Sequence, residues 1–395
     1  MYEREACGKL LARLKESRRF IQVLVGPRQV GKTTIVKQVL SKLEVPYLYV
    51  SADAVPSENL GWIGDTWELA RTRMRVGGDR EFVLAIDEIQ KIRNWSEAVK
   101  KEWDADTFAD VNIKVVLLGS SRVMLERGLS ESMQGRFEEL RVAHWSFPEM
   151  QAAFGFDEVE YMYFGGYPGA ATLAKDYERW SEYIGTSIIE ATIQKDVLMG
   201  SNVAKPALLR QAFELGAQYS GKELSYTKMM GSLVDAGNTT TLAGYLALLS
   251  AAGMLSALPK CTVDQARQRA SSPKFQVHDN SLRSHYLGVP PKDIMSNPVE
   301  WGRCVESAVG AHLMSRAFVD NYEAMYWRDG ELEVDFVLKK QGKLVAIEVK
   351  TNRETFTSGM AEFRKRFKPH GVLLVGPEGM PVGDFLALNP LDLFR

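Results

Sequence analysis

The chain has 395 residues, of which 45% are hydrophobic and 25% charged, and its formal net charge is −1. This composition is typical of a globular protein with two to four domains and argues against a disordered, collagen-like or generally basic chain. Cys7, Cys261 and Cys304 lie far apart, which argues against a disulfide framework or a zinc motif. No run approaches the roughly 20 apolar residues that span a bilayer, so we expect a cytoplasmic protein.

The first element in chain order is an apolar strand over residues 20–25, followed by a glycine loop and a helix over residues 34–40. The loop reads G-x-x-x-x-G-K-T, the pattern whose backbone N–H groups hold the phosphates of a nucleoside triphosphate at a helix N-terminus. The bland alternative is a glycine turn with an exposed lysine. The expected ATP-binding residues are Gly26, Pro27, Arg28, Gln29, Val30, Gly31, Lys32, Thr33 and Thr34.

Two of these side chains carry the expected chemistry. Lys32 reaches the β- and γ-phosphates, and the hydroxyl of Thr33 holds Mg²⁺. A second apolar strand, residues 82–86, ends in Asp87 and Glu88. We expect Asp87 to support Mg²⁺ and Glu88 to polarise the attacking water, although the strand could simply end on two solvated acids.

A third apolar strand, residues 113–118, ends in Gly119 followed by Ser120 and Ser121. Because ligands gather at the carboxyl ends of parallel strands, a serine here is placed to sense the γ-phosphate, and a serine-rich turn is the alternative. Arg136 is a candidate for stabilising charge on the transferred phosphoryl group, in cis or in trans, and a surface ion pair is an equal alternative. Alternation of strands with helical segments at residues 60–73 and 95–104 predicts an α/β domain with a parallel sheet.

The segments VGPRQVGKTT, LAIDEIQKI, LLGSSRVML and LSESMQGRF, followed by WSFPEM, resemble the AAA-type ATP-binding proteins of bacteria and archaea that carry a C-terminal domain of unknown function. The resemblance extends through residues 163–168 and 193–196. It implies an AAA-type ATPase core over residues 1–148 and a small helical lid over residues 149–204, with Ser120 in the position called sensor 1.

Residues 205–292 favour a winged helix, because helices near residues 206–219, after Ser225 and from about 239 to 252 precede strands at residues 254–258 and 275–278. The third helix contains no lysine or arginine over residues 241–249, whereas base-reading helices usually do. Contact with DNA through the wing and packing against protein are therefore both open. The basic residues of the expected wing are Lys260, Arg267, Arg269 and Lys274.

The last segment, residues 293–395, contains Asp335, a twelve-residue gap, and then Glu348-Val349-Lys350 on the next expected strand. Alternation along a strand places Glu348 and Lys350 on one face, and a hairpin can bring Asp335 beside them. Two carboxylates and the Val349 carbonyl could bind Mg²⁺, while Lys350 could activate water or neutralise a scissile phosphate.

This arrangement resembles the PD-(D/E)XK, or restriction-endonuclease-like, nuclease core, with expected element order α-β-β-β-α-β. The resemblance implies Glu306, on the preceding helix, as a further metal-supporting acid. The chain departs from that pattern before Asp335, where it reads Glu331-Leu332-Glu333-Val334 instead of Pro-Asp.

We therefore expect an ATPase whose nucleotide state gates a DNA-directed, nuclease-like module. The alternative is an ATP-dependent switch that binds a protein or DNA partner and whose nuclease-like domain is catalytically inactive. A third interpretation is a ring-forming motor, which would need a homo-oligomer because Arg136 would act in trans.

Overall fold

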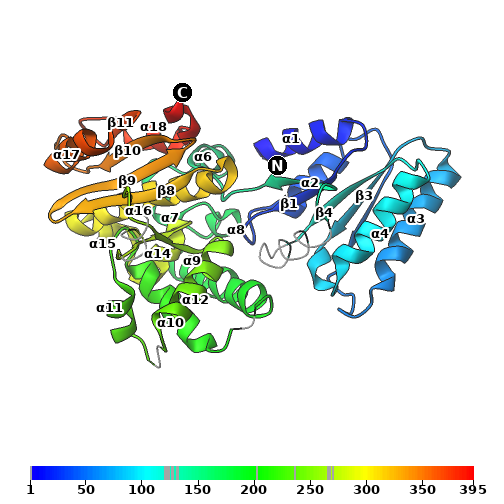
Figure 1. Ribbon diagram of the computed structural model, residues 1–395, viewed down its shortest axis with the longest axis horizontal. Coiled ribbons are helices and arrows are strands. Elements are labelled where there is room, and N and C mark those ends of the chain that lie inside the picture. Colours follow the sequence, from blue (N-terminus) through cyan, green and yellow to red (C-terminus); the bar gives the residue numbers. More distant parts are fainter. Residues whose placement is uncertain are drawn as a thin grey trace. The chain divides into compact units, whose positions relative to one another are not determined.

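The computed structural model describes residues 2–119, 125, 129, 133–201, 203–234, 237–264, 268 and 271–395. The chain divides into two compact units, Met1–Val142 and Ala143–Arg395 (Figure 1). The expected helical connector at residues 149–204 belongs to the second unit. The first unit ends six residues before the expected limit at residue 148.

The first unit is built on a five-stranded sheet in the order β2-β3-β4-β1-β5 within the described residues. Every neighbouring pair is parallel. The three central strands are buried along their whole length, as continuous apolar runs predict for a parallel sheet. The strands are β1 (Ile21–Val25), β2 (Tyr47–Ser51), β3 (Phe82–Asp87), β4 (Ile113–Leu118) and β5 (Phe137–Arg141).

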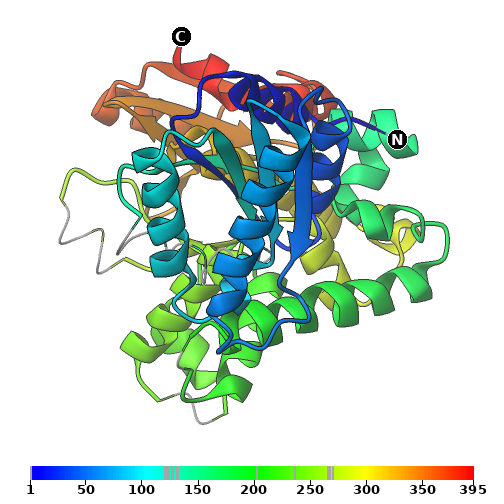
Figure 2. The same ribbon diagram turned by 90° about the vertical axis from the view of Figure 1, so that its right-hand side faces the viewer.

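Helices cover both faces of this sheet, as right-handed crossovers between parallel strands require. In Figure 1, α1 (Glu5–Lys15) and α2 (Lys32–Leu40) lie on one side of the strands, and α3 (Gly61–Gly77) and α4 (Trp95–Phe108) lie on the other. Figure 2 shows α3 and α4 side by side in front of the strands, and the two helices pack against each other. The predicted α/β domain with a parallel sheet is therefore confirmed.

The second unit begins with short helices, α6 (Phe147–Phe154), α7 (Glu158–Phe164), α8 (Pro168–Ala171) and α9 (Tyr177–Tyr183), followed by π-helical turns over Ile184–Glu190 and Ile193–Leu198. The break between α7 and α8 has a specific cause. The φ of Gly165 is +73°, and a Cβ there would lie 2.0 Å from Asp279 Oδ1. The Asp279 carboxylate also accepts a hydrogen bond from the N–H of Gly166 at 2.7 Å. Only glycine at position 165 lets the chain pass so close to the buried Asp279 carboxylate.

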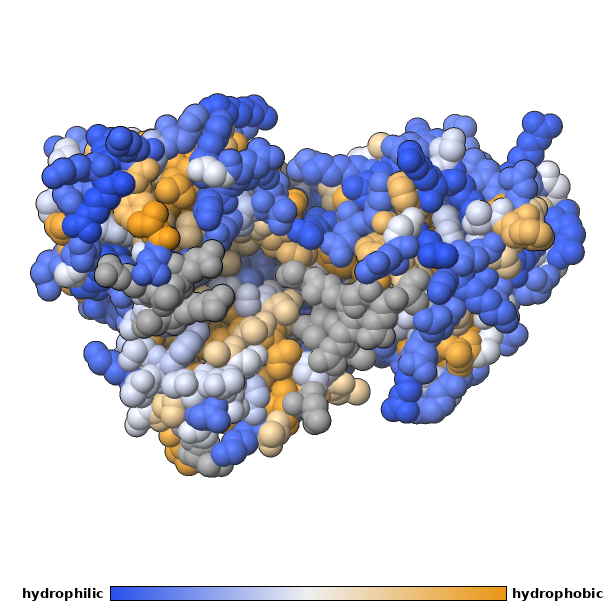
Figure 3. Space-filling view, viewed as in Figure 1, coloured by the Kyte–Doolittle hydropathy of each residue, from blue (hydrophilic) through white to orange (hydrophobic). Residues whose placement is uncertain are grey.

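The next elements follow the predicted order of helices and a hairpin. Helices α10 (Pro206–Gln218), α11 (Tyr226–Gly231) and α12 (Thr239–Ala251) precede the antiparallel strands β6 (Leu255–Leu258) and β7 (Lys274–Val277). Asn238 caps α12 by accepting a hydrogen bond from the N–H of Thr241. Helices α14 (Asn280–Leu287) and α15 (Pro291–Met295) complete this part. Figure 3 shows that the surface over α10, α11 and α12 carries fewer strongly hydrophilic residues than its surroundings.

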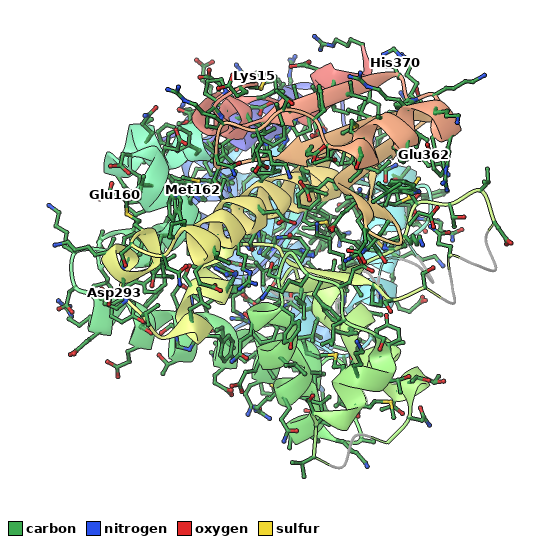
Figure 4. The ribbon with its side chains drawn as sticks, turned by 90° about the vertical axis from the view of Figure 1, so that its left-hand side faces the viewer. Lys15, Glu160, Met162, Asp293, Glu362 and His370 are labelled. Atoms are coloured by element: carbon green, nitrogen blue, oxygen red, sulfur yellow. The ribbon has the colours of Figure 1, made fainter. Side chains whose placement is uncertain are left out.

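The C-terminal part is a four-stranded sheet in the order β11-β10-β9-β8, with a parallel pair between β10 and β11 and antiparallel pairs elsewhere. Helix α16 packs against β8 and β10, and α17 packs against β9 and β10. In Figure 4, α16 runs beneath the strands, and Glu362 marks α17. The elements are α16 (Pro298–Asp320), β8 (Glu323–Asp329), β9 (Leu332–Lys340), β10 (Lys343–Val349), α17 (Ser358–Phe367), β11 (Gly371–Val375) and α18 (Val382–Ala387). Among the described residues, no helix combines the length and apolar character needed to cross a membrane.

Candidate functional site

The glycine loop joins the end of β1 to the start of α2. Its backbone visits the left-handed region at Gln29, with φ +60°, and at Gly31, with φ +92°. Gly26 passes so close to the strand beside it that a Cβ would lie 2.1 Å from the carbonyl oxygen of Val142. These constraints hold the loop in a tight arch over the N-terminus of α2, where helix N–H groups favour an anion. The structure thus places residues 26–34 where the sequence predicts a phosphate cradle.

The ammonium of Lys32 lies within this arch. Lys32 is buried, and its Nζ donates hydrogen bonds to the carbonyl oxygens of Gly26 at 2.9 Å and Pro27 at 2.6 Å. The positive charge is therefore held at the loop itself. Of the other predicted loop side chains, Arg28 is half-buried and Thr34 is exposed on α2.

Thr33 and Asp87 meet at the carboxyl edge of the sheet. The Thr33 hydroxyl donates to Asp87 Oδ2 at 2.9 Å, and the N–H of Glu88 donates to Asp87 Oδ1 at 2.9 Å. A hydroxyl and a carboxylate beside a phosphate cradle are the oxygen donors that Mg²⁺ prefers, so this pair fits the ion expected with ATP. The predicted Mg²⁺ partners are thus adjacent in space although 54 residues apart in sequence.

Tyr49 is a third member of this group that the sequence reasoning missed. Tyr49 is the central residue of β2, and its hydroxyl donates to Asp87 Oδ2 at 2.6 Å. Burial, together with the hydrogen bond and charge of Asp87, raises the pKa of Tyr49 above its usual value, so the phenol remains a donor. A tyrosine in a short strand belongs to no recognisable sequence motif, so it could not be predicted. Only the parallel pairing of Ser51 with Asp87 brings β2 beside the end of β3.

Glu88 is held by a side chain that was also not predicted. Its backbone lies in the left-handed region, with φ +55°, and its Oε2 accepts a hydrogen bond from Gln90 Nε2 at 2.6 Å. Gln90 is buried, and its Oε1 lies over the end of β4, where a Cβ on Gly119 would be 2.0 Å away. Gln90 therefore links the acid after β3 to the end of β4. The predicted sensor residue Ser120 lies outside the described residues.

Arg136 lies far from the glycine loop of its own chain. Its carbonyl accepts a hydrogen bond from the N–H of Ile21, the first residue of β1, whereas the loop follows the last residue of that strand. A five-residue strand spans roughly 16 Å, which is further than an arginine side chain reaches. The guanidinium instead makes a bidentate pair with Asp104, at 2.7 and 2.9 Å. A role in cis is therefore excluded in this arrangement, and the predicted ion pair is present.

A second polar cluster lies in the C-terminal sheet. Asp335 follows Val334 on β9, and Glu348 lies near the end of β10, next to the paired residues Phe336 and Ile347. Asp335 Oδ2 accepts a hydrogen bond from the N–H of Val349 at 2.7 Å. Lys350 Nζ lies 3.3 Å from Glu348 Oε1, and the charges of Asp335 and Glu348 raise the pKa of Lys350 against the opposing effect of burial. The hairpin thus brings together the predicted Asp335, Glu348 and Lys350.

The metal site expected from these residues is not assembled. The other oxygen of the Glu348 carboxylate, Oε2, accepts a hydrogen bond from the Thr357 hydroxyl at 3.1 Å. Glu306 on α16 pairs with Lys274, whose Nζ lies 2.5 Å from Glu306 Oε1. Within the described ranges, no group of three His, Cys, Asp or Glu side chains is arranged to hold a metal ion. In this arrangement the carboxylates of the predicted metal set, Glu306, Asp335 and Glu348, are engaged by lysine, threonine and backbone donors, and the set with Val349 stays a prediction.

The basic residues of the expected wing lie in different environments. Lys274 has no exposed surface, which favours the packing alternative over contact with DNA at this residue. Lys260 is half-buried beside β8, where it forms a parallel bridge with Tyr326. Arg267 and Arg269 lie outside the described residues.

Comparison with family models divides the chain into three segments. Residues 18–151 match the model described as AAA domain. Residues 156–293 and residues 301–393 each match a model described as a domain of unknown function, DUF8612 and DUF4143 respectively.

Curated relatives are similar along most of their length. An uncharacterised protein of Haemophilus influenzae is 22% identical over 88% of this chain and 86% of its own length. An uncharacterised protein of Mycobacterium tuberculosis is 23% identical over 94% of this chain and 80% of its own length. An uncharacterised protein of Methanocaldococcus jannaschii is 21% identical over 82% of this chain and 73% of its own length.

Among solved structures, the Aeropyrum pernix ORC1 protein in complex with DNA aligns with 73% of this chain and 93% of its own, at 14% identity and a TM-score of 0.31. A variant of Thermotoga maritima RuvB aligns with 64% of this chain and 86% of its own, at 19% identity and a TM-score of 0.34. With its parallel sheet, its glycine loop and the match of residues 18–151, the first part of the chain is similar to the AAA domain of P-loop ATPases.

Proposed function

We propose that the protein binds ATP with Mg²⁺ in the glycine loop, hydrolyses it, and uses the cycle to change how Ala143–Arg395 binds a partner. The contact between Thr33 and Asp87 beside the Lys32 ammonium carries the first part of this proposal. Lys32 would neutralise the β- and γ-phosphates, and Thr33 with Asp87 would hold the ion. The ion would supply charge neutralisation on the phosphates.

Glu88 would orient and polarise the attacking water. In the present arrangement its Oε2 accepts a hydrogen bond from Gln90, which makes the carboxylate a weaker acceptor for a water proton. We therefore propose that Gln90 must release Glu88 during the cycle. Ser120, at the end of β4, would sense the γ-phosphate. Arg136 would serve only a neighbouring copy in a homo-oligomer, after leaving Asp104.

For the output we propose partner binding through the second unit, with α10, α11, α12 and the β6–β7 hairpin as a winged helix. The features that support a protein partner over direct readout of DNA are the lack of lysine and arginine in α12 and the burial of Lys274. Contact with DNA through other parts of the wing or the C-terminal sheet is the competing outcome.

A mutant series tests ATP hydrolysis. We expect Lys32→Ala to abolish nucleotide binding, and Glu88→Gln to retain binding of ATP while phosphate release falls by two or more orders of magnitude, as roughly expected for loss of a water-orienting base. Glu97→Gln, an exposed acid on α4, is the matched control. Unchanged hydrolysis in both Lys32→Ala and Glu88→Gln would refute the assignment.

A second candidate output is metal-dependent cleavage of nucleic acid by a PD-(D/E)XK-like domain. The observations that favour it are the order α16-β8-β9-β10-α17-β11 and the proximity of Asp335 to the β10 strand that carries Glu348. Assays with Mg²⁺ or Mn²⁺, with and without ATP, on the wild type, Lys32→Ala and Asp335→Ala would decide. Cleavage that disappears only in Asp335→Ala would establish a nuclease, and its absence in every nucleotide state leaves partner binding as the output.

A further inference from the structure

Lys274 is a buried cation beside acidic side chains of α16 and β9, and strand pairing holds its backbone on both edges. It pairs with Leu258 of β6 in the antiparallel hairpin and forms an antiparallel bridge with Glu223 on its other side. The side chain has no exposed surface, and its Nζ lies 4.9 Å from the centre of the Phe336 ring. An ammonium in such a position is stable only if opposite charges and hydrogen-bond acceptors surround it.

Three acidic residues supply these acceptors. The Nζ of Lys274 lies 2.5 Å from Glu306 Oε1, 3.7 Å from Glu333 Oε1 and 3.9 Å from Asp335 Oδ1, and it donates a hydrogen bond to the Asp335 carbonyl at 3.1 Å. Oxygen atoms from α16 and β9 thus converge on one positive centre. We call Lys274, Glu306, Glu333 and Asp335 the ammonium cluster.

The charges in the cluster stabilise one another. Burial alone would lower the pKa of Lys274, but Glu306, Asp335 and Glu333 together raise it above the usual lysine value. Burial and the neighbouring Asp335 and Glu333 carboxylates raise the pKa of Glu306, because three acids share one buried cation. Outside the cluster, Arg328 lies 3.7 Å from Glu333 Oε2 and 3.1 Å from Glu223 Oε1.

Carboxylate and carbonyl oxygens converging on one point are also the donor set of a divalent cation. We propose that the Lys274 ammonium takes the place of such a cation in the ammonium cluster, so that the carboxylates bind no divalent ion while Lys274 is present. A cation within ligand distance of Glu306 would overlap the ammonium and face its positive charge. The proposal does not depend on ATP hydrolysis and concerns the second unit alone.

The ammonium cluster also joins the two segments of the second unit that match different family models. Lys274 belongs to the segment 156–293, which matches the first domain of unknown function, while its three acidic partners belong to the segment 301–393, which matches the second. A bound metal would satisfy the same acids within residues 301–393 alone. Use of a lysine instead ties β7 to α16 and β9 across the boundary between the two matched segments.

Mn²⁺ binding to the nucleotide-free, full-length protein tests the proposal, with free Mn²⁺ measured by electron paramagnetic resonance. Asp87→Ala serves as the background of every arm, so that the nucleotide site does not contribute. We expect no Mn²⁺ bound at the cluster in this background. Adding Lys274→Met removes the ammonium, and we expect it to add on the order of one Mn²⁺ per chain and to make thermal unfolding sensitive to Mn²⁺. Lys228→Met, an exposed lysine on α11, is the matched control and should add none.

The outcomes separate cleanly. Gain of a Mn²⁺ site in Lys274→Met that is lost again with Asp335→Asn supports the proposal, as does a Lys274→Met protein that folds only when Mn²⁺ is present. A folded Lys274→Met protein that gains no site overturns it. If Lys274→Met folds in neither condition, variants that keep Lys274 decide. If the Asp87→Ala protein binds Mn²⁺ and adding Glu306→Gln or Asp335→Asn abolishes this binding, the proposal is overturned. If the Asp87→Ala protein shows no such binding, the proposal is supported.

Discussion

Tyr49→Phe is the most informative substitution at the nucleotide site, because it removes the hydroxyl that donates a hydrogen bond to the Asp87 carboxylate and leaves the aromatic ring in place. A hydrogen bond to a charged acceptor contributes roughly 1.5–3 kcal/mol. Asp87 keeps two other donors, the Thr33 hydroxyl and the Glu88 N–H, so we take the lower end. If this energy orients Asp87 for the ion, a loss of about 1.4 kcal/mol raises the Mg²⁺ concentration for half-maximal hydrolysis about tenfold.

The assay is phosphate release at saturating ATP, titrated with free Mg²⁺. Tyr47→Phe is the matched control, because Tyr47 lies two residues earlier on β2 and is 45% exposed. Nucleotide binding without Mg²⁺ should be equal in all three proteins, since the deleted hydroxyl donates its hydrogen bond to Asp87, whose expected role is to hold the ion. An unchanged Mg²⁺ dependence in Tyr49→Phe would refute the view that this hydroxyl positions Asp87.

Three further outcomes are expected. Gly26→Ala places a Cβ 2.1 Å from the Val142 carbonyl, so we expect a loss of roughly 1–3 kcal/mol in unfolding free energy and of ATP binding, whereas Gly8→Ala, with no atom within 4 Å, should cost nothing in either measurement. Arg136→Ala should lower stability by about 1 kcal/mol or less, and mixing it with Glu88→Gln chains should restore hydrolysis only if Arg136 acts in trans. Burial lowers the pKa of His312 from 6.5 to about 4, so the unfolded chain takes up a proton first and stability is lost as pH falls from about 6.5 towards 4, by on the order of 3 kcal/mol. His312→Gln should flatten this part of a chemical-denaturation pH profile, and an unchanged slope would contradict the assignment.

The elements close together in sequence were predictable because their physics is local. The strand before Gly26, the arch of the loop and the helix after Gly31 follow from neighbouring residues, and the structure shows β1 and α2 within two residues of the expected limits. The apolar run of β4 was predicted with its observed bounds. The partners of the ATPase motifs were less accessible, since β2 and its Tyr49 reach Asp87 only through pairing across the sheet.

Contacts between charged residues far apart in sequence decided the roles of Arg136 and Lys274, which the sequence alone left open. Local patterning determined the glycine loop, the two acids at the end of β3 and the hairpin that carries Asp335 and Glu348. Only the tertiary structure showed that Arg136 lies at the opposite end of β1 from the loop, and that Lys274 is buried among carboxylates rather than exposed on a wing. The sequence alone does not distinguish a buried lysine from an exposed one. Its role depends on which acids the fold brings to it, and those acids come from helices and strands at least 32 residues away along the chain.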